Sequence, residues 1–109
     1  MEGVGHLHFV PLEDLGVKNT PVYLHQIKEL GVKFGLRFCN PVAALYLLKA
    51  QFPFGPRYNF VTLASDPFDL SGDQVVISVQ RKMKSKNLLP VAVNKIAPWY
   101  GCNTFVFCS

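Results

Sequence analysis

The chain has 109 residues, of which 50% are hydrophobic and 17% are charged, and its formal net charge is +4. A sequence this apolar excludes an intrinsically disordered protein, and its length is typical of one globular domain, here spanning residues 1–109. No apolar run approaches the roughly 20 residues of a membrane-spanning helix, and the acidic Glu2 begins no secretory signal, so we expect no membrane span.

Strand and helix signals alternate in the first part of the chain. Residues 6–10 (HLHFV) are typical of a short strand. Thr20-Pro21 is typical of a helix start, and apolar residues at helical spacing follow it as far as Gly31, where we expect the helix to end. Residues 32–38 then alternate between apolar and basic or small side chains, which predicts a strand with one buried and one basic face.

A second helix and four further strands are expected in the rest of the chain. Asn40-Pro41 repeats the helix-start signal, and the apolar segment 42–52 predicts a central helix. The expected strands cover 58–64, 74–80, 89–93 and 103–108, with a polar turn region at 65–73. Pro90 lacks a backbone donor, so it places its strand at a sheet edge or begins it.

This order predicts an α+β fold with a mixed, mostly antiparallel sheet of four to six strands and two helices packed on one face. The last expected strand runs to the end of the sequence, so no tail covers its edge. An uncovered edge presents free backbone groups to another strand. We therefore expect a homodimer, with a different protein partner as the alternative.

The cysteines are Cys39, Cys102 and Cys108. Their odd number, without a secretory signal, favours reduced thiols in a reducing, cytoplasmic compartment. On one extended strand Cys102 and Cys108 would lie roughly 20 Å apart, which is too far for a disulfide without a bend. We expect buried, unreactive thiols, with Cys39 beside the second helix start as a weaker candidate nucleophile.

Basic charge gathers in one segment of the second half. From Gln74 onward the chain has no acidic residue and five basic ones. Four of these lie between two expected strands: Arg81, Lys82, Lys84 and Lys86. A segment of one sign attracts a polyanion, and Lys33 and Arg37 on the basic strand face would add to it. The alternative is a solvated hairpin tip that keeps an apolar protein soluble.

Aromatic residues near turns complete the candidate site. Trp99 and Tyr100 would stack on bases, and Phe54 and Tyr58 are further candidates. The leading hypothesis is therefore a small non-enzymatic protein, without a cofactor, that binds single-stranded RNA or DNA. The first alternative is a structural or protein-interaction module that assembles through apolar surface and an open sheet edge.

A weaker alternative is a hydrolase or a metal site. His6 and His8 are two residues apart, so in a strand their side chains face the same side. With His25 they would supply three ligands for a metal ion. No second histidine-containing element or other catalytic motif accompanies them, and an exposed strand face explains the pair as well.

Overall fold

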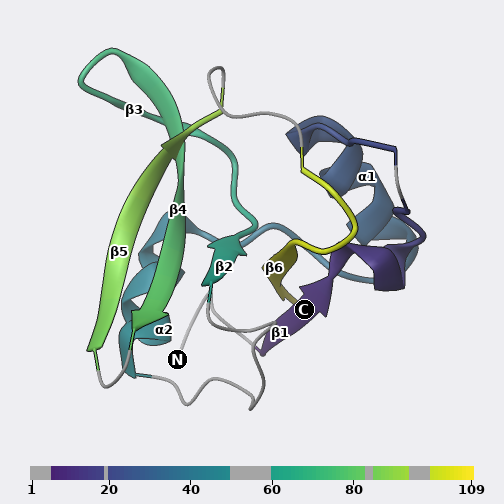
Figure 1. Cartoon of the computed structure of the whole chain (residues 1–109), viewed down its shortest axis with the longest axis horizontal. Coiled ribbons are helices and arrows are strands. Elements are labelled where there is room, and N and C mark those ends of the chain that lie inside the picture. The colour runs from purple at the N-terminus through teal and green to yellow at the C-terminus, as the bar shows by residue number, and fades with distance from the viewer. Residues whose placement is uncertain (1–5, 19, 50–59, 83–84, 94–98) are drawn as a thin grey trace.

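Strands of one mixed sheet run through the molecule, with a helix packed against each face (Figure 1). The computed structural model describes residues 6–18, 20–49, 60–82, 85–93 and 99–109. The strands are β1 (Leu7–Pro11), β2 (Phe60–Leu63), β3 (Phe68–Leu70), β4 (Asp73–Lys82), β5 (Ser85–Ala92) and β6 (Thr104–Cys108). The helices are α1 (Leu24–Lys33) and α2 (Ala44–Lys49), with short 3₁₀ turns η1 (Leu12–Leu15) and η2 (Pro41–Ala43).

The strand β6 lies inside the sheet. It pairs antiparallel with β1 and parallel with β2, and β2 continues the sheet to β4, which also pairs with β3 and β5. The predicted α+β class and mixed, mostly antiparallel sheet are confirmed. The expected open edge at the last strand is wrong, because β1 and β2 occupy both sides of β6 and every residue of β6 is buried.

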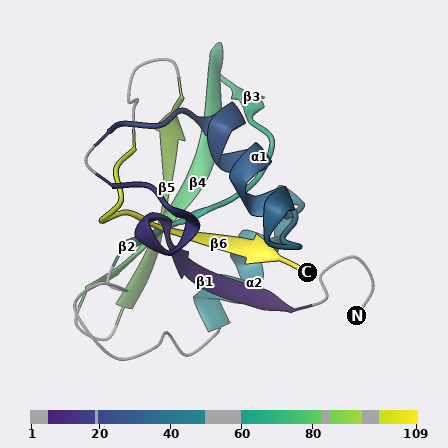
Figure 2. The ribbon, with the colours of Figure 1, turned by 90° about the vertical axis from the view of Figure 1, so that its right-hand side faces the viewer.

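Alternate residues of β6 contribute to two separate cores. Phe105 and Phe107 pack in a cluster with Ile27 of α1, whereas Val106 packs in a second cluster with Leu47 of α2. The two helices therefore lie on opposite faces of the sheet rather than on one face as predicted (Figure 2). A strand that is apolar on both faces needs cover on both faces, and one helix supplies each cover.

The helix α1 starts later than the Thr20-Pro21 signal. Val22 and Trp99 exchange two backbone hydrogen bonds of 2.8 and 2.9 Å, so the chain stays extended up to Tyr23. The Tyr23 N–H then donates to the Gln26 side-chain oxygen at 2.8 Å, which satisfies a free backbone donor just before the first turn.

The predicted strand at 32–38 is wrong because α1 continues through Lys33. Gly31 is helical, and a Cβ atom built on it would lie 2.8 Å from the ring of Phe107, so a glycine here allows close packing rather than a helix end. The left-handed turn falls at Gly35, with φ of 76°. Of the predicted strand, Arg37 alone forms a bridge, with Cys108.

Most other elements appear close to their predicted positions. Asn40 caps η2 by accepting from the Val42 N–H at 3.0 Å, and α2 follows, although the last residues of the predicted helix lie outside the described ranges. The expected turn region contains the short strand β3, which joins β4 through Ser71 and Gly72, both with positive φ as a two-residue hairpin requires. β5 is an edge strand, in agreement with Pro90.

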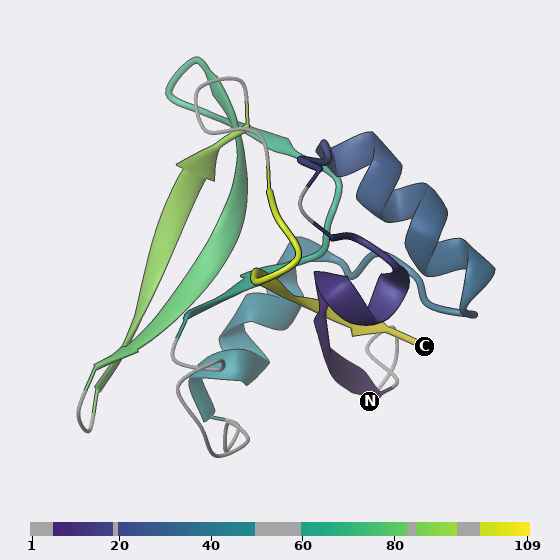
Figure 3. The same ribbon diagram turned by 45° about the vertical axis from the view of Figure 1, so that its right-hand side comes forward.

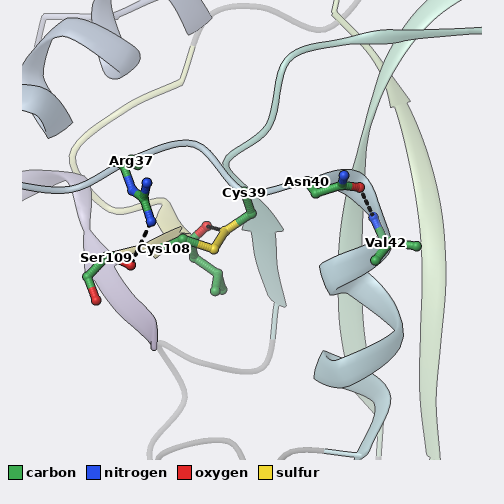
Figure 4. Close-up of a disulfide and its surroundings, with 7 residues drawn as sticks. Arg37, Cys39, Asn40, Val42, Cys108 and Ser109 are labelled. Atoms are coloured by element: carbon green, nitrogen blue, oxygen red, sulfur yellow. Dashed lines mark hydrogen bonds between the residues drawn. A yellow bond between two sulfur atoms is a disulfide. The ribbon is translucent and has the colours of Figure 1, made fainter. Parts of the chain in front are cut away.

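A disulfide between Cys39 and Cys108 joins the segment before α2 to the end of β6 (Figure 4). The Cα atoms are 5.3 Å apart, a separation that suits the bond. The expectation of reduced thiols is therefore wrong for these two cysteines, so the cysteines no longer favour a reducing compartment. Pairing across 69 positions depends on the tertiary fold, which brings residue 39 beside β6.

Removing this disulfide is predicted to lower the free energy of unfolding by about 4 kcal/mol, because the bond closes a long loop in the unfolded chain. The measurement is urea denaturation of the oxidised protein and of a Cys39→Ala/Cys108→Ala variant. The matched control is Cys102→Ala, since Cys102 is a free, exposed cysteine and its removal should change stability by less than about 0.5 kcal/mol. Equal stability of the double variant and the oxidised protein would contradict the prediction.

Candidate nucleic-acid interface

The strands β4 and β5 pair with each other along their length and form a two-stranded arm. Arg81, Lys82 and Lys86 of the basic segment lie at the end of this arm. β2 pairs with β4 only as far as Gln80, whereas β5 follows β4 as far as Lys82, so the end of the arm extends beyond β2 (Figure 3). Arg81 lies opposite Lys86 across the two strands, and Lys82 lies opposite Ser85. Lys84 lies outside the described residues. Arg81, Lys82 and Lys86 therefore lie at the same end of the arm.

Arg81 and Lys86 lie on the face of the arm that α2 covers. They follow Val79, which packs in the same cluster as Leu47 of α2. The Lys86 ammonium group donates to the backbone oxygen of Leu47 at 3.4 Å, near the carboxyl end of α2. The carbonyl end of a helix carries partial negative charge, so this contact stabilises both groups. Part of the basic segment is thus explained by its contact with a helix end.

The opposite face of the arm carries a row of exposed side chains from three neighbouring strands. Phe60 of β2 lies opposite Gln80 of β4, which lies opposite Asn87 of β5, and all three are exposed. Residues directly opposite in antiparallel strands share a face and lie side by side. We call Phe60, Gln80 and Asn87 the amide–aromatic row.

The sheet changes from buried to exposed at this row. In the neighbouring row, Thr62 and Ser78 are almost fully buried, and their hydroxyl oxygens are hydrogen-bonded at 2.9 Å. One step further along β2, Phe60 is 42% exposed. An exposed aromatic ring on a sheet face beside two amide groups is the kind of surface on which a nucleobase can stack.

The row was not identified from the sequence, although one signal pointed to it. The expected strand 58–64 is apolar on both faces, and the structure buries Val61 and Leu63 against α2 while Phe60 faces the other side. A large apolar residue on the second face of a strand needs its own partner, inside or outside the chain. The sequence could not show which partner it has.

The two aromatics proposed for stacking lie elsewhere. Trp99 is only 6% exposed and packs edge-on against Phe105 with ring centroids 5.4 Å apart, so it belongs to the core. Tyr100 is 44% exposed, but it lines a pocket of about 770 Å³ together with Glu13 and Asp14. The pocket contains two carboxylates and one cation, Lys18, so it suits phosphate groups less well than the arm does. Phe54 and Tyr58, the further candidates, lie outside the described residues.

Lys33 and Arg37 do not extend the basic segment. Lys33 ends α1, and the end of α1 and the tip of the arm lie at opposite corners of the molecule (Figure 3). Arg37 lies beside Cys108, and its guanidinium group donates to the backbone oxygen of Ser109 at 3.0 Å (Figure 4). The six predicted cations thus divide between two distant places, with Arg81, Lys82 and Lys86 described at the arm.

The weaker enzymatic alternatives gain no support from the arrangement of side chains. Within the described ranges, no group of three histidine, cysteine or acidic residues is placed to hold a metal ion. His6 precedes β1 and His8 belongs to it, while His25 stacks on Tyr23 with ring centroids 6.4 Å apart. Cys39 is held in the disulfide, so it presents no thiolate for nucleophilic attack.

The comparisons with known proteins assign no family. No protein-family model matches the chain, and no curated protein or solved structure matches it. Among the described residues, no helix has the length and apolar character needed to cross a membrane. The arm and the amide–aromatic row are therefore the features from which a function can be inferred.

Proposed function

We propose that the protein binds single-stranded nucleic acid on the open face of the arm formed by β4 and β5. The observation that carries the proposal is the amide–aromatic row, which is next to Arg81 and Lys86 along the same two strands. Because side chains alternate between the two faces, these cations lie on the opposite face, and a bound strand would reach them by passing around the end of the arm. An exposed aromatic side chain and nearby cations are the two elements of single-strand binding.

Phe60 provides the stacking surface in this proposal. A base on its ring would have the amides of Gln80 and Asn87 within the same row, and an amide group can donate to and accept from a base edge. Nucleobases in a duplex are already stacked on their neighbours, so this surface favours unpaired bases. Both RNA and DNA present such bases, and the row favours neither.

The cations at the end of the arm would bind phosphate groups. Arg81 and Lys86 are directly opposite each other across the two strands, so one phosphate group would contact both. Lys86 already contacts the end of α2, which holds its side chain near the arm.

A second candidate function is assembly with another copy through the outer side of α2. Val42 of the preceding turn η2 and Leu45 and Tyr46 of α2 are 52%, 55% and 36% exposed and have the spacing of one helix face. The free edge of β5 is a less suitable contact, because Pro90 cannot donate a backbone hydrogen bond. A homodimer, if formed, is therefore proposed at α2 and no longer at the last strand.

Replacing Phe60 by alanine should weaken binding of a short labelled single-stranded RNA or DNA by roughly 5- to 150-fold, because stacking contributes about 1–3 kcal/mol per base. Fluorescence anisotropy at low salt measures the change. Phe60→Tyr keeps the ring and should bind as the unchanged protein does. Leu70→Ala is the matched control, since Leu70 is 44% exposed on β3. Equal affinities of Phe60→Ala and Leu70→Ala would argue against stacking on this row.

Replacing Arg81, Lys82, Lys84 and Lys86 by glutamine should reduce the dependence of binding on salt. Each phosphate contact with a single strand adds about 0.7 to the slope of log K against log salt concentration, so the slope should fall by as much as about 3. The measurement is the same titration at several salt concentrations. The control replaces Lys18 and Lys33, which lie away from the arm. A slope that is equally reduced in the control, or unchanged in both, would place the phosphate contacts elsewhere.

Leu45→Glu should abolish self-association if the outer side of α2 joins two copies, because it places a carboxylate within an apolar contact. Sedimentation velocity over a range of protein concentrations gives the mass. The control Leu70→Glu changes another exposed leucine, on β3, and should leave the mass unchanged. A monomer at every concentration, in the unchanged protein, would remove this candidate.

A further inference from the structure

A second exposed surface lies at the turn that follows α1, far from the arm (Figure 3). Val32 and Phe34 are 64% and 58% exposed, the two highest values among the large hydrophobic residues of the described ranges. Lys33 lies between them and Arg37 follows three residues after Phe34, and both are exposed. We call these four residues the α1 corner.

The backbone of the α1 corner needs no water to satisfy its donors. The N–H groups of the turn donate to backbone oxygens of the protein: Phe34 and Leu36 to Gly31 at 2.9 Å each, Gly35 to Val32 at 3.0 Å, and Arg37 to Cys108 at 2.7 Å. A turn with free donors resists entry into an apolar medium, because each unsatisfied group costs several kcal/mol. The N–H groups of this turn are hydrogen-bonded within the protein, so they do not add this cost.

The α1 corner is also held in place. Arg37 and Cys108 exchange two backbone hydrogen bonds, and the disulfide fixes Cys39 to the same strand end. Gly35 supplies the left-handed conformation that the turn requires. Val32 and Phe34 are therefore presented without a loop having to become ordered on binding, which removes one cost of association.

The charge around the corner is positive. Lys28 pairs with Asp66 at 2.9 Å, so these two charges offset each other. The carboxylate of Glu29 lies one helical turn before Lys33, and the sequence has no further acidic residue until Asp66. Arg37 donates to the backbone oxygen of Ser109, and its side chain remains exposed. Both cations sit on long aliphatic stems, which can lie along an apolar surface while the charged ends stay in water.

We propose that the α1 corner docks on the surface of an anionic phospholipid bilayer. Val32 and Phe34 enter the boundary between headgroups and acyl chains, and Lys33 and Arg37 meet the lipid phosphates. The end of α1 lies at the outer limit of the molecule (Figure 3), and an exposed apolar pair with flanking cations fits a broad, soft, negatively charged surface. The inference is independent of nucleic-acid binding at the arm.

The test is co-sedimentation of the oxidised full-length chain with large unilamellar vesicles. One set contains phosphatidylcholine alone, and the other contains phosphatidylserine and phosphatidylcholine at a ratio of about 3 to 7. The corner variant is Val32→Ser/Phe34→Ser. Its matched control is Leu70→Ser/Leu88→Ser, which removes two exposed apolar residues from β3 and β5. A Lys33→Gln variant tests the charge, and circular dichroism confirms that each variant is folded.

The unchanged protein is expected to bind the anionic vesicles at least tenfold more strongly than the neutral ones, because two cations approach the anionic surface. Val32→Ser/Phe34→Ser should lower binding at least tenfold, and Lys33→Gln should lower it about fivefold on anionic vesicles only. Absence of vesicle binding by the unchanged protein would overturn the proposal. So would equal loss in the Leu70→Ser/Leu88→Ser control, or a corner variant whose only change is a lower mass in sedimentation velocity, which would indicate a contact between two copies.

Discussion

The burial of β6 on both faces is the constraint on which the rest of the structure depends. Phe105 and Phe107 require cover on one side, and Val106 and Cys108 require it on the other. This need separates α1 from α2 and divides the apolar residues into two cores. It also explains Gly31, because α1 approaches Phe107 so closely that a side chain at position 31 would enter the aromatic ring. The position of each helix thus follows from a five-residue strand.

Patterns of neighbouring residues predicted most of the helices and strands, but they did not predict which distant segments pair with each other. The Asn40-Pro41 cap and the edge position of Pro90 depend on neighbouring residues, and both predictions are confirmed. The alternation at 32–38 suggested a strand, but the preceding helix continues into it, and Val32 and Phe34 stay exposed. The parallel pairing of β2 with β6 and the disulfide each join segments that are far apart in the sequence, and no pattern of neighbouring residues predicts that these segments meet.

The sequence predicted the basic residues of the candidate site, but it did not predict its aromatic residue, Phe60. Cations in one connection between strands are visible in the sequence, and the arm presents them together. The expected turn at Trp99 suggested an exposed ring that could stack on a base. In the structure Trp99 belongs to the core, because its backbone pairs with Val22 and its ring packs against Phe105. Phe60, and not Trp99, is the exposed ring beside the arm. The sequence alone could not distinguish these two rings, because exposure depends on which faces of the sheet the helices cover.

The pairing of β1 with β6 has a consequence for the time course of folding. Leu7 lies opposite Cys108 and Pro11 opposite Thr104, so the first described strand finds its partner almost a hundred positions later in the chain. Such a pairing closes a very long loop before any of its contacts contribute, and β-rich chains with distant contacts fold in milliseconds to seconds rather than microseconds. The arm of β4 and β5, whose strands are adjacent in sequence, can form much sooner. A newly made chain would therefore carry its basic arm for some time before the sheet around β6 is complete.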